Sequence, residues 1–129
     1  MEYVADTIAI TRFISHPNRL GKRALVILRE ADSGNSKIIL SIISLVEIMY
    51  LSEKGRLKFK LKDVLEKVDT HEYFQIIDLD RSILLEAQNI QNLELHDRLI
   101  VATAKHLELP LLTCDQDIKS ANLIETIWD

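Results

Sequence analysis

Residues 38–47 read Ile-Ile-Leu-Ser-Ile-Ile-Ser-Leu-Val-Glu, and this stretch is the clearest guide to the fold class. The run Ile38-Ile39-Leu40 is too apolar to alternate, which is typical of a strand that is buried on both faces. A helix-length segment, residues 45–53, follows it closely. A buried strand followed by a helix is the repeating unit of a parallel sheet that helices cover on both sides.

The same succession of short apolar runs and helix-length segments extends along the whole chain. Four further runs predict strands at residues 3–5, 74–77, 111–113 and 123–124. The intervening segments predict helices at residues 8–14, 22–32, 61–68, 81–91 and 97–107. No repeat or linker divides the chain, so we expect one domain over residues 1–129, with three α/β/α layers around a central parallel sheet of four to five strands. Right-handed crossovers then place the carboxyl ends of all strands at one edge of the sheet.

The composition excludes several classes of protein. The chain has 129 residues, one cysteine, three glycines and a formal net charge of −4. The single Cys114 forms no internal disulfide and no thiolate zinc site. The three glycines do not form a G-x-G-x-x-G motif or a Walker loop, and the motif G-x-S-x-G is absent too. The amino terminus lacks a basic signal-peptide region, and the most apolar segment is far shorter than the ~20 residues of a membrane span. We therefore expect a cytoplasmic protein with no membrane segment.

Four carboxylates stand at places that the predicted fold brings together: three follow strands, and the fourth begins a helix. Asp6 closes the first strand and Asp115 follows the fourth, while Glu47 lies in the first turn of the helix after the second strand and Asp97 opens the helix 97–107. The topology brings all four to one edge, where open α/β sheets bind their ligands. Clustered carboxylates repel one another unless a cation neutralises them, and oxygen ligands suit Mg²⁺ or Mn²⁺. This pattern indicates metal-assisted hydrolysis of a phosphoester.

Helix capping is the alternative interpretation of the same four residues. Asp6 and Asp115 stand where N-caps are expected, Asp97 stands in a first turn, and Glu47 completes a capping box that begins at Ser44. In that case the protein is a catalytically idle α/β module that binds a partner helix. Against this, Glu47 is surrounded by apolar neighbours, where an acid seldom serves a cap alone.

The ordered pieces of this sequence resemble the PIN-domain family, and in particular its small VapC-like ribonuclease toxins. The matching pieces span the chain: residues 4–7 (Val-Ala-Asp-Thr), 41–48 (Ser-Ile-Ile-Ser-Leu-Val-Glu-Ile), 95–104 (Leu-His-Asp-Arg-Leu-Ile-Val-Ala-Thr-Ala) and 111–117 (Leu-Leu-Thr-Cys-Asp-Gln-Asp). Each piece is weak alone, but the ordered set is fairly specific.

The resemblance implies a Mg²⁺- or Mn²⁺-dependent endoribonuclease with a parallel sheet. The residues that match the family's metal ligands and catalytic acids are Asp6, Glu47, Asp97 and Asp115. Similar proteins use a residue like Thr113 to organise the site, and an acid like Asp117 sometimes joins it. Members often form homodimers, and many are held inactive by a small antitoxin. The resemblance leaves the RNA target open.

The net charge of −4 argues at first against a nucleic-acid partner, but a basic stretch changes this interpretation. Residues 53–62 contain five Lys or Arg and one Glu, a balance of +4 that leaves −8 for the rest of the chain. Arg56, Lys58 and Lys60 alternate there with apolar residues, so an extended segment has one cationic and one apolar face. A looser basic group near the first strand includes Arg12. Both are candidates to hold an RNA backbone, and the alternative is a solvated face over the core.

Two other phosphoryl chemistries fit the sequence less well. A haloacid-dehalogenase-type phosphatase also begins with an Asp after the first strand, but it needs a second Asp two residues later, where this chain has Ile8. A receiver domain needs an acidic pair near the first strand and a late lysine, and neither is visible.

Overall fold

The computed structural model describes all residues from 1 to 129. Its strands are β1 (Glu2–Ala5), β2 (Lys37–Ser41), β3 (Phe74–Ile77), β4 (Leu111–Leu112) and β5 (Thr126–Ile127). Its helices are α1 (Thr7–Ser15), α2 (Lys22–Asp32), α3 (Ile42–Glu53), α4 (Leu61–Thr70), α5 (Arg81–Gln88), α6 (Leu95–Leu107) and α7 (Gln116–Ala121), with a short 3-10 turn, η1 (Pro17–Arg19). No helix is long and apolar enough to cross a membrane.

The five strands form one parallel sheet in the order β3-β2-β1-β4-β5, which confirms the predicted fold class. The chain winds outward from β1 through β2 to β3, then returns to the other side of β1 for β4 and β5. Val4 in the central strand pairs with both Ile39 and Leu111. The winding therefore reverses between β1 and β4, and a reversal of this kind opens a ligand-binding crevice at the carboxyl ends of the strands.

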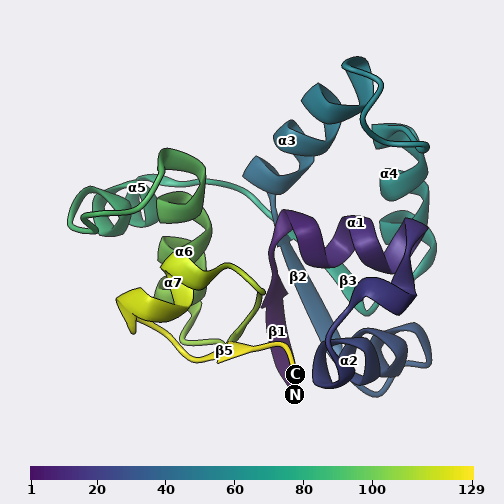
Figure 1. The fold of residues 1–129 in the computed structure, drawn as a ribbon, viewed down its shortest axis with the longest axis horizontal. Coiled ribbons are helices and arrows are strands. Elements are labelled where there is room, and N and C mark those ends of the chain that lie inside the picture. Colours follow the sequence, from purple (N-terminus) through teal and green to yellow (C-terminus); the bar gives the residue numbers. More distant parts are fainter.

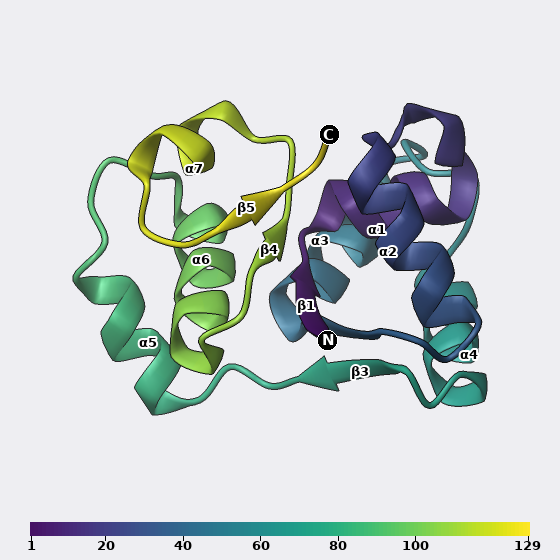
Figure 2. The same cartoon turned by 90° about the horizontal axis from the view of Figure 1, so that it is seen from below.

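Helices cover both faces of the sheet (Figures 1 and 2). One face packs against α1 to α4 in a core that includes Leu28, Leu45 and Val64. The opposite face packs against α5 to α7 in a second core that includes Ile100 and Ile118. Successive residues of each buried strand point to opposite cores, so the strands are apolar on both sides, as the three-layer prediction requires.

The last strand lies further along the chain than predicted. The sequence pattern favoured residues 123–124, whereas β5 is Thr126–Ile127, paired with Leu111–Leu112. Helix α7 ends at Ala121, and its C-cap Asn122 is in the left-handed conformation (φ 53°). The chain needs the next three residues to turn back toward β4. Pairing geometry, rather than local hydrophobicity, therefore determines which residues form this strand.

Helices α3 and α6 begin three and two residues earlier than predicted, and the expected capping box is wrong. Helix α3 begins at Ile42, because β2 extends to Ser41 and the Ser41 hydroxyl accepts a hydrogen bond from the Ile43 N–H (3.2 Å). Ser44 is inside the helix, where its buried hydroxyl has no hydrogen-bond partner, and Glu47 lies in the second turn. Helix α6 begins two residues before Asp97. Glu47 is therefore not a capping residue.

Candidate metal centre at the carboxyl end of the sheet

Asp6 joins the end of β1 to the start of α1 and uses both carboxylate oxygens. Its Oδ1 accepts a hydrogen bond from the Ala9 N–H (2.8 Å), so it is the N-cap of α1, as the capping interpretation predicted. Its Oδ2 accepts from the Thr113 hydroxyl (2.5 Å). Burial raises the pKa of Asp6 from 3.8 to about 6; the charges of Asp115 and Glu47 act in the same direction, whereas the hydrogen bonds lower it. The cap uses only one of the two carboxylate oxygens. Burial of the ionised carboxylate therefore still destabilises the folded protein.

Thr113 connects Asp6 with Asp115 across two neighbouring strands. The Asp115 N–H donates to the Thr113 hydroxyl oxygen (3.1 Å), and that hydroxyl donates to Asp6. The Asp115 side chain caps α7 by accepting from the Ile118 N–H (3.0 Å). Thr113 is only 3% exposed, so water does not compete for these bonds. One hydroxyl group therefore links Asp6 and Asp115, at the place between β1 and β4 where the winding of the chain reverses.

Glu47 reaches the same edge from α3 without contacting the start of its own helix. Its Oε1 accepts a hydrogen bond from the hydroxyl of Thr7 (2.9 Å), the residue after Asp6. Its Oε2 lies 3.8 Å from His96 Nδ1. The sequence pattern predicts no role for Thr7. The position of Thr7 beside Asp6 was the available signal for the first contact, but the second depends on how α3 and α6 pack.

Asp97 is the least restrained of the four acids. Glu94, not Asp97, caps α6, because its carboxylate accepts from the N–H groups of His96 (3.1 Å) and Asp97 (3.4 Å). The Asp97 carboxylate accepts no hydrogen bond from the protein. Burial raises its pKa to about 6, and the charges of Asp115, Glu94, Glu47 and Asp6 add to the effect, in that order. Asp97 therefore experiences the field of the other three predicted ligands.

These four carboxylates have little compensation from basic side chains. Only Glu47 has a partner within ion-pair distance, His96. No three acidic, histidine or cysteine side chains of the chain are gathered tightly enough to form a ready-made metal site. Mutual repulsion of the ionised groups opposes closer approach. An all-oxygen donor set of this kind fits Mg²⁺ or Mn²⁺ and does not fit zinc or copper.

The other predicted site residues divide into two groups. Asp117 is exposed in the first turn of α7, and its side chain forms no hydrogen bond or ion pair with the four acids. Lys60 stands apart at the start of α4, where its backbone N–H donates to Asp63 (2.7 Å). The structure therefore leaves Asp117 and Lys60 outside the clusters that it forms.

Arg12, Arg56 and Lys58 line a single hollow of about 240 Å³ between α1, η1 and the loop that joins α3 to α4. Arg19 also lines it, and no carboxylate does. Within the loop the basic side chains are exposed and the intervening leucines and phenylalanine are half-buried against the core, as predicted. Two basic groups that are 44 residues apart in sequence, counted from Arg12 to Arg56, thus meet at one surface.

Comparisons with known proteins agree with this architecture. A family model described as PIN domain matches residues 3–123. No curated protein matches the chain. Among solved structures, the chain is similar to one in VapBC2 from Rickettsia felis bound to a DNA fragment from their promoter, with 21% identity, a TM-score of 0.72 and 100% of both chains covered.

Two further structures are similar in fold. For FitAcB from Neisseria gonorrhoeae the identity is 20% and the TM-score 0.68, over 97% of this chain and 96% of that one. For a toxin-antitoxin complex from Klebsiella pneumoniae the values are 19% and 0.64, over 95% and 94%. Identities this low show a shared fold.

Proposed function

The chain belongs to the PIN-domain family, whose members are generally nucleases, and on this premise we propose that it is a Mg²⁺- or Mn²⁺-dependent endoribonuclease. One observation supports the proposal: Asp6, Glu47, Asp97 and Asp115 lie close enough for their charges to raise the pKa of Asp6 and Asp97, and no Lys or Arg is paired with any of the four. Their repulsion destabilises the metal-free fold, and a divalent cation bound among them relieves it.

The four acids differ in how far hydrogen bonds within the protein already orient their carboxylates. Asp6 and Glu47 are oriented by the hydroxyl groups of Thr113 and Thr7. Asp115 is oriented by its capping bond, and Asp97 has both oxygens free of protein donors. Bound there, the ion would lower the pKa of a water molecule and stabilise the charge that grows on the leaving oxygen during in-line displacement at phosphorus. The residues of the chain supply the position and the negative charge that this chemistry needs.

RNA is the substrate that we propose, and the resemblance to VapC-like toxins is the first reason. The second is the hollow lined by Arg12, Arg56 and Lys58, because unpaired cations beside an acidic centre attract a phosphate backbone. An RNA substrate and a single cysteine, Cys114, suit a cytoplasmic protein.

We also propose two protein partners. Solved structures of similar fold are described as VapBC and toxin-antitoxin complexes, and on that basis this chain is the toxin of a type II toxin-antitoxin system with a cognate antitoxin. The second partner is another copy of the chain. Helix α3 is apolar around most of its circumference, yet Val46, Met49 and Tyr50 are 42–53% exposed on it. A homodimer that covers these side chains would sediment as twice the monomer mass, and Tyr50→Glu would release monomers.

The substitution Asp97→Asn tests catalysis against capping. It removes a charge from the cluster and leaves the cap of α6, Glu94, in place. We expect it to abolish Mn²⁺-dependent cleavage of RNA, and we expect thermal stability in EDTA to be unchanged or raised because like-charge repulsion is relieved.

A matched control is Asp80→Asn, which alters an acid that does cap a helix. Asp80 accepts a hydrogen bond from the Ile83 N–H at the start of α5 (2.9 Å) and has no part in the cluster. The control should retain cleavage. If Asp97→Asn instead melts well below the parent, and the parent cleaves no RNA with either metal, the carboxylates serve only as structural groups.

A further inference from the structure

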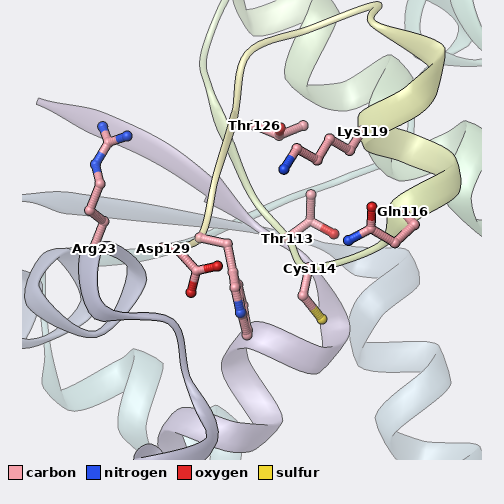
Figure 3. A pocket seen from close by; sticks show the side chains of 8 residues that line it. Arg23, Thr113, Cys114, Gln116, Lys119, Thr126 and Asp129 are labelled. Atoms are coloured by element: carbon pink, nitrogen blue, oxygen red, sulfur yellow. The ribbon is translucent and has the colours of Figure 1, made fainter.

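A pocket beside the carboxylate cluster has no role in the chemistry described so far (Figure 3). It has a volume of about 240 Å³ and lies where β4 and β5 end, between α2 and α7. Thr113 lines it and also donates to Asp6, so one residue belongs to both the pocket and the cluster. A ligand that extends from the cluster over β4 therefore enters this pocket.

One wall of the pocket is held by backbone contacts. The carbonyl of Trp128 accepts a hydrogen bond from the Ala24 N–H (3.1 Å) at the start of α2, and the Ile127 carbonyl accepts from the Thr113 N–H (3.2 Å). Gly21 permits the first contact, because a Cβ there would lie 2.1 Å from the Trp128 oxygen. The Trp128 ring also packs against the Arg12 guanidinium, 5.8 Å from the ring centroid. The pocket is thus a fixed part of the fold.

The polar groups in the pocket are mostly donors without partners. Arg23 from α2 and Lys119 from α7 both line it, and neither has a carboxylate within 4.0 Å. The side chains of Gln116 and Thr126 form no hydrogen bond within the protein. In Figure 3 the Lys119 and Gln116 side chains extend toward Thr113 across the pocket. One carboxylate side chain, Asp129, opposes the two cations.

We propose that this pocket binds the phosphate of the nucleotide adjacent to the one that is cleaved. The inference rests on the proposed ribonuclease function and adds a second binding position to it. A polynucleotide presents one phosphate per residue, so a strand whose scissile phosphate lies at the carboxylate cluster must place the next phosphate nearby. Arg23 and Lys119 neutralise that phosphate, and the Gln116 amide and Thr126 hydroxyl donate hydrogen bonds to it.

The test compares two double variants that remove the same charge. Arg23→Ala with Lys119→Ala empties the pocket of cations. Lys37→Ala with Lys105→Ala removes two surface cations that pair with Glu2 and Glu86 away from the cluster. Binding of a short fluorescent single-stranded RNA is measured by anisotropy at several salt concentrations, in an Asp97→Asn background that prevents cleavage.

We expect the pocket variant to bind RNA about tenfold more weakly, since it loses charge-assisted hydrogen bonds. The slope of log Kd against log salt should fall by about 0.7, the value for one phosphate of a single strand. The control variant should change neither quantity as much. Asp129→Asn should change RNA affinity in the opposite direction, because removal of the opposing carboxylate should tighten RNA binding. If the pocket instead binds a cationic group, the same substitution should weaken binding of that ligand.

A small substrate separates this inference from the proposed function. Bis(p-nitrophenyl) phosphate has one phosphodiester and no neighbouring phosphate, so the pocket variant should lose rate on RNA relative to rate on this diester. Equal losses on both substrates, or an affinity equal to that of the control, overturn the pocket assignment alone. A parent protein that neither binds nor cleaves RNA overturns the ribonuclease proposal, and this one with it.

Discussion

The burial of Asp6 makes the stability of the metal-free protein depend on pH. Asp6 is 6% exposed, and its pKa is raised from 3.8 to about 6, chiefly by burial. A shift of roughly 2 pKa units corresponds to roughly 3 kcal/mol. Because the folded pKa lies above the unfolded one, the stability from this group is fully present below pH 3.8 and is lost as pH rises through 6.

The substitution Asp6→Asn removes that dependence while it keeps the shape of the side chain. The Asn oxygen still accepts from the Ala9 N–H, and the new amide can donate to the Thr113 oxygen. In EDTA above pH 6 we therefore expect the variant to be more stable than the parent. The gain is up to about 3 kcal/mol, reduced by whatever strength the altered hydrogen bond loses. Asp97, whose pKa is also raised to about 6, leaves a pH dependence of the same sign in both proteins.

Urea unfolding at a series of pH values, in EDTA and in excess Mn²⁺, measures both effects. The parent should lose stability from about pH 4 to about pH 7 in EDTA and recover it with Mn²⁺, because a ligand that binds only the folded state stabilises it. The Asn variant should show a flatter profile and a smaller gain from Mn²⁺. A parent whose stability rises with pH over this range, together with a variant that is less stable above pH 6, would mean that the buried Asp6 charge does not destabilise the fold.

Three further substitutions test the supporting contacts. Thr113→Val should raise the pKa of Asp6 further, and it should lower stability by about 2 kcal/mol near neutral pH but little near pH 4. An NMR titration measures the pKa and urea unfolding measures the stability. Thr113→Ser should keep the pKa and the stability of the parent. A variant whose carboxyl titration is unmoved contradicts the hydroxyl's role. Glu94→Ala should cost about 1 kcal/mol by uncapping α6, and a neutral result in urea unfolding excludes that cap. Gly21→Ala should shift the emission of Trp128, the one tryptophan, and cost about 1–3 kcal/mol, whereas unchanged fluorescence and stability rule out the close contact.

The layered parallel fold was predictable from local patterns, because the buried strands are apolar on both sides and helices follow them. The start of α3 was not predictable in the same way. Ser41 and Ser44 are both suitable caps, and the choice between them depends on β2, which pairs as far as Ser41 with Ile77 of β3. Register between strands is a long-range property, so the local pattern assigned Glu47 to a cap that does not exist.

The chain positions of the acids were predictable, but their partners were not. Asp6 and Asp115 follow strands and cap helices, as their places in the sequence indicate. The bond from Thr113 to Asp6 spans 107 residues and the bond from Thr7 to Glu47 spans 40. Contacts of this range arise from the order of strands in the sheet, which no single segment encodes. For the same reason the pairing of two distant cations in one pocket became visible only in the folded chain.

Location of bound Mn²⁺ is the most direct test of the carboxylate cluster. Crystals of the parent protein grown with Mn²⁺ and measured near the manganese absorption edge would reveal the ion by its anomalous scattering. We expect a peak about 2.1 Å from carboxylate oxygens of at least Asp6, Asp97 and Asp115, and we expect Asp97→Asn to lose it. A protein saturated with Mn²⁺ that shows no peak at this edge of the sheet, or shows one only elsewhere, would mean that these carboxylates are not the metal ligands.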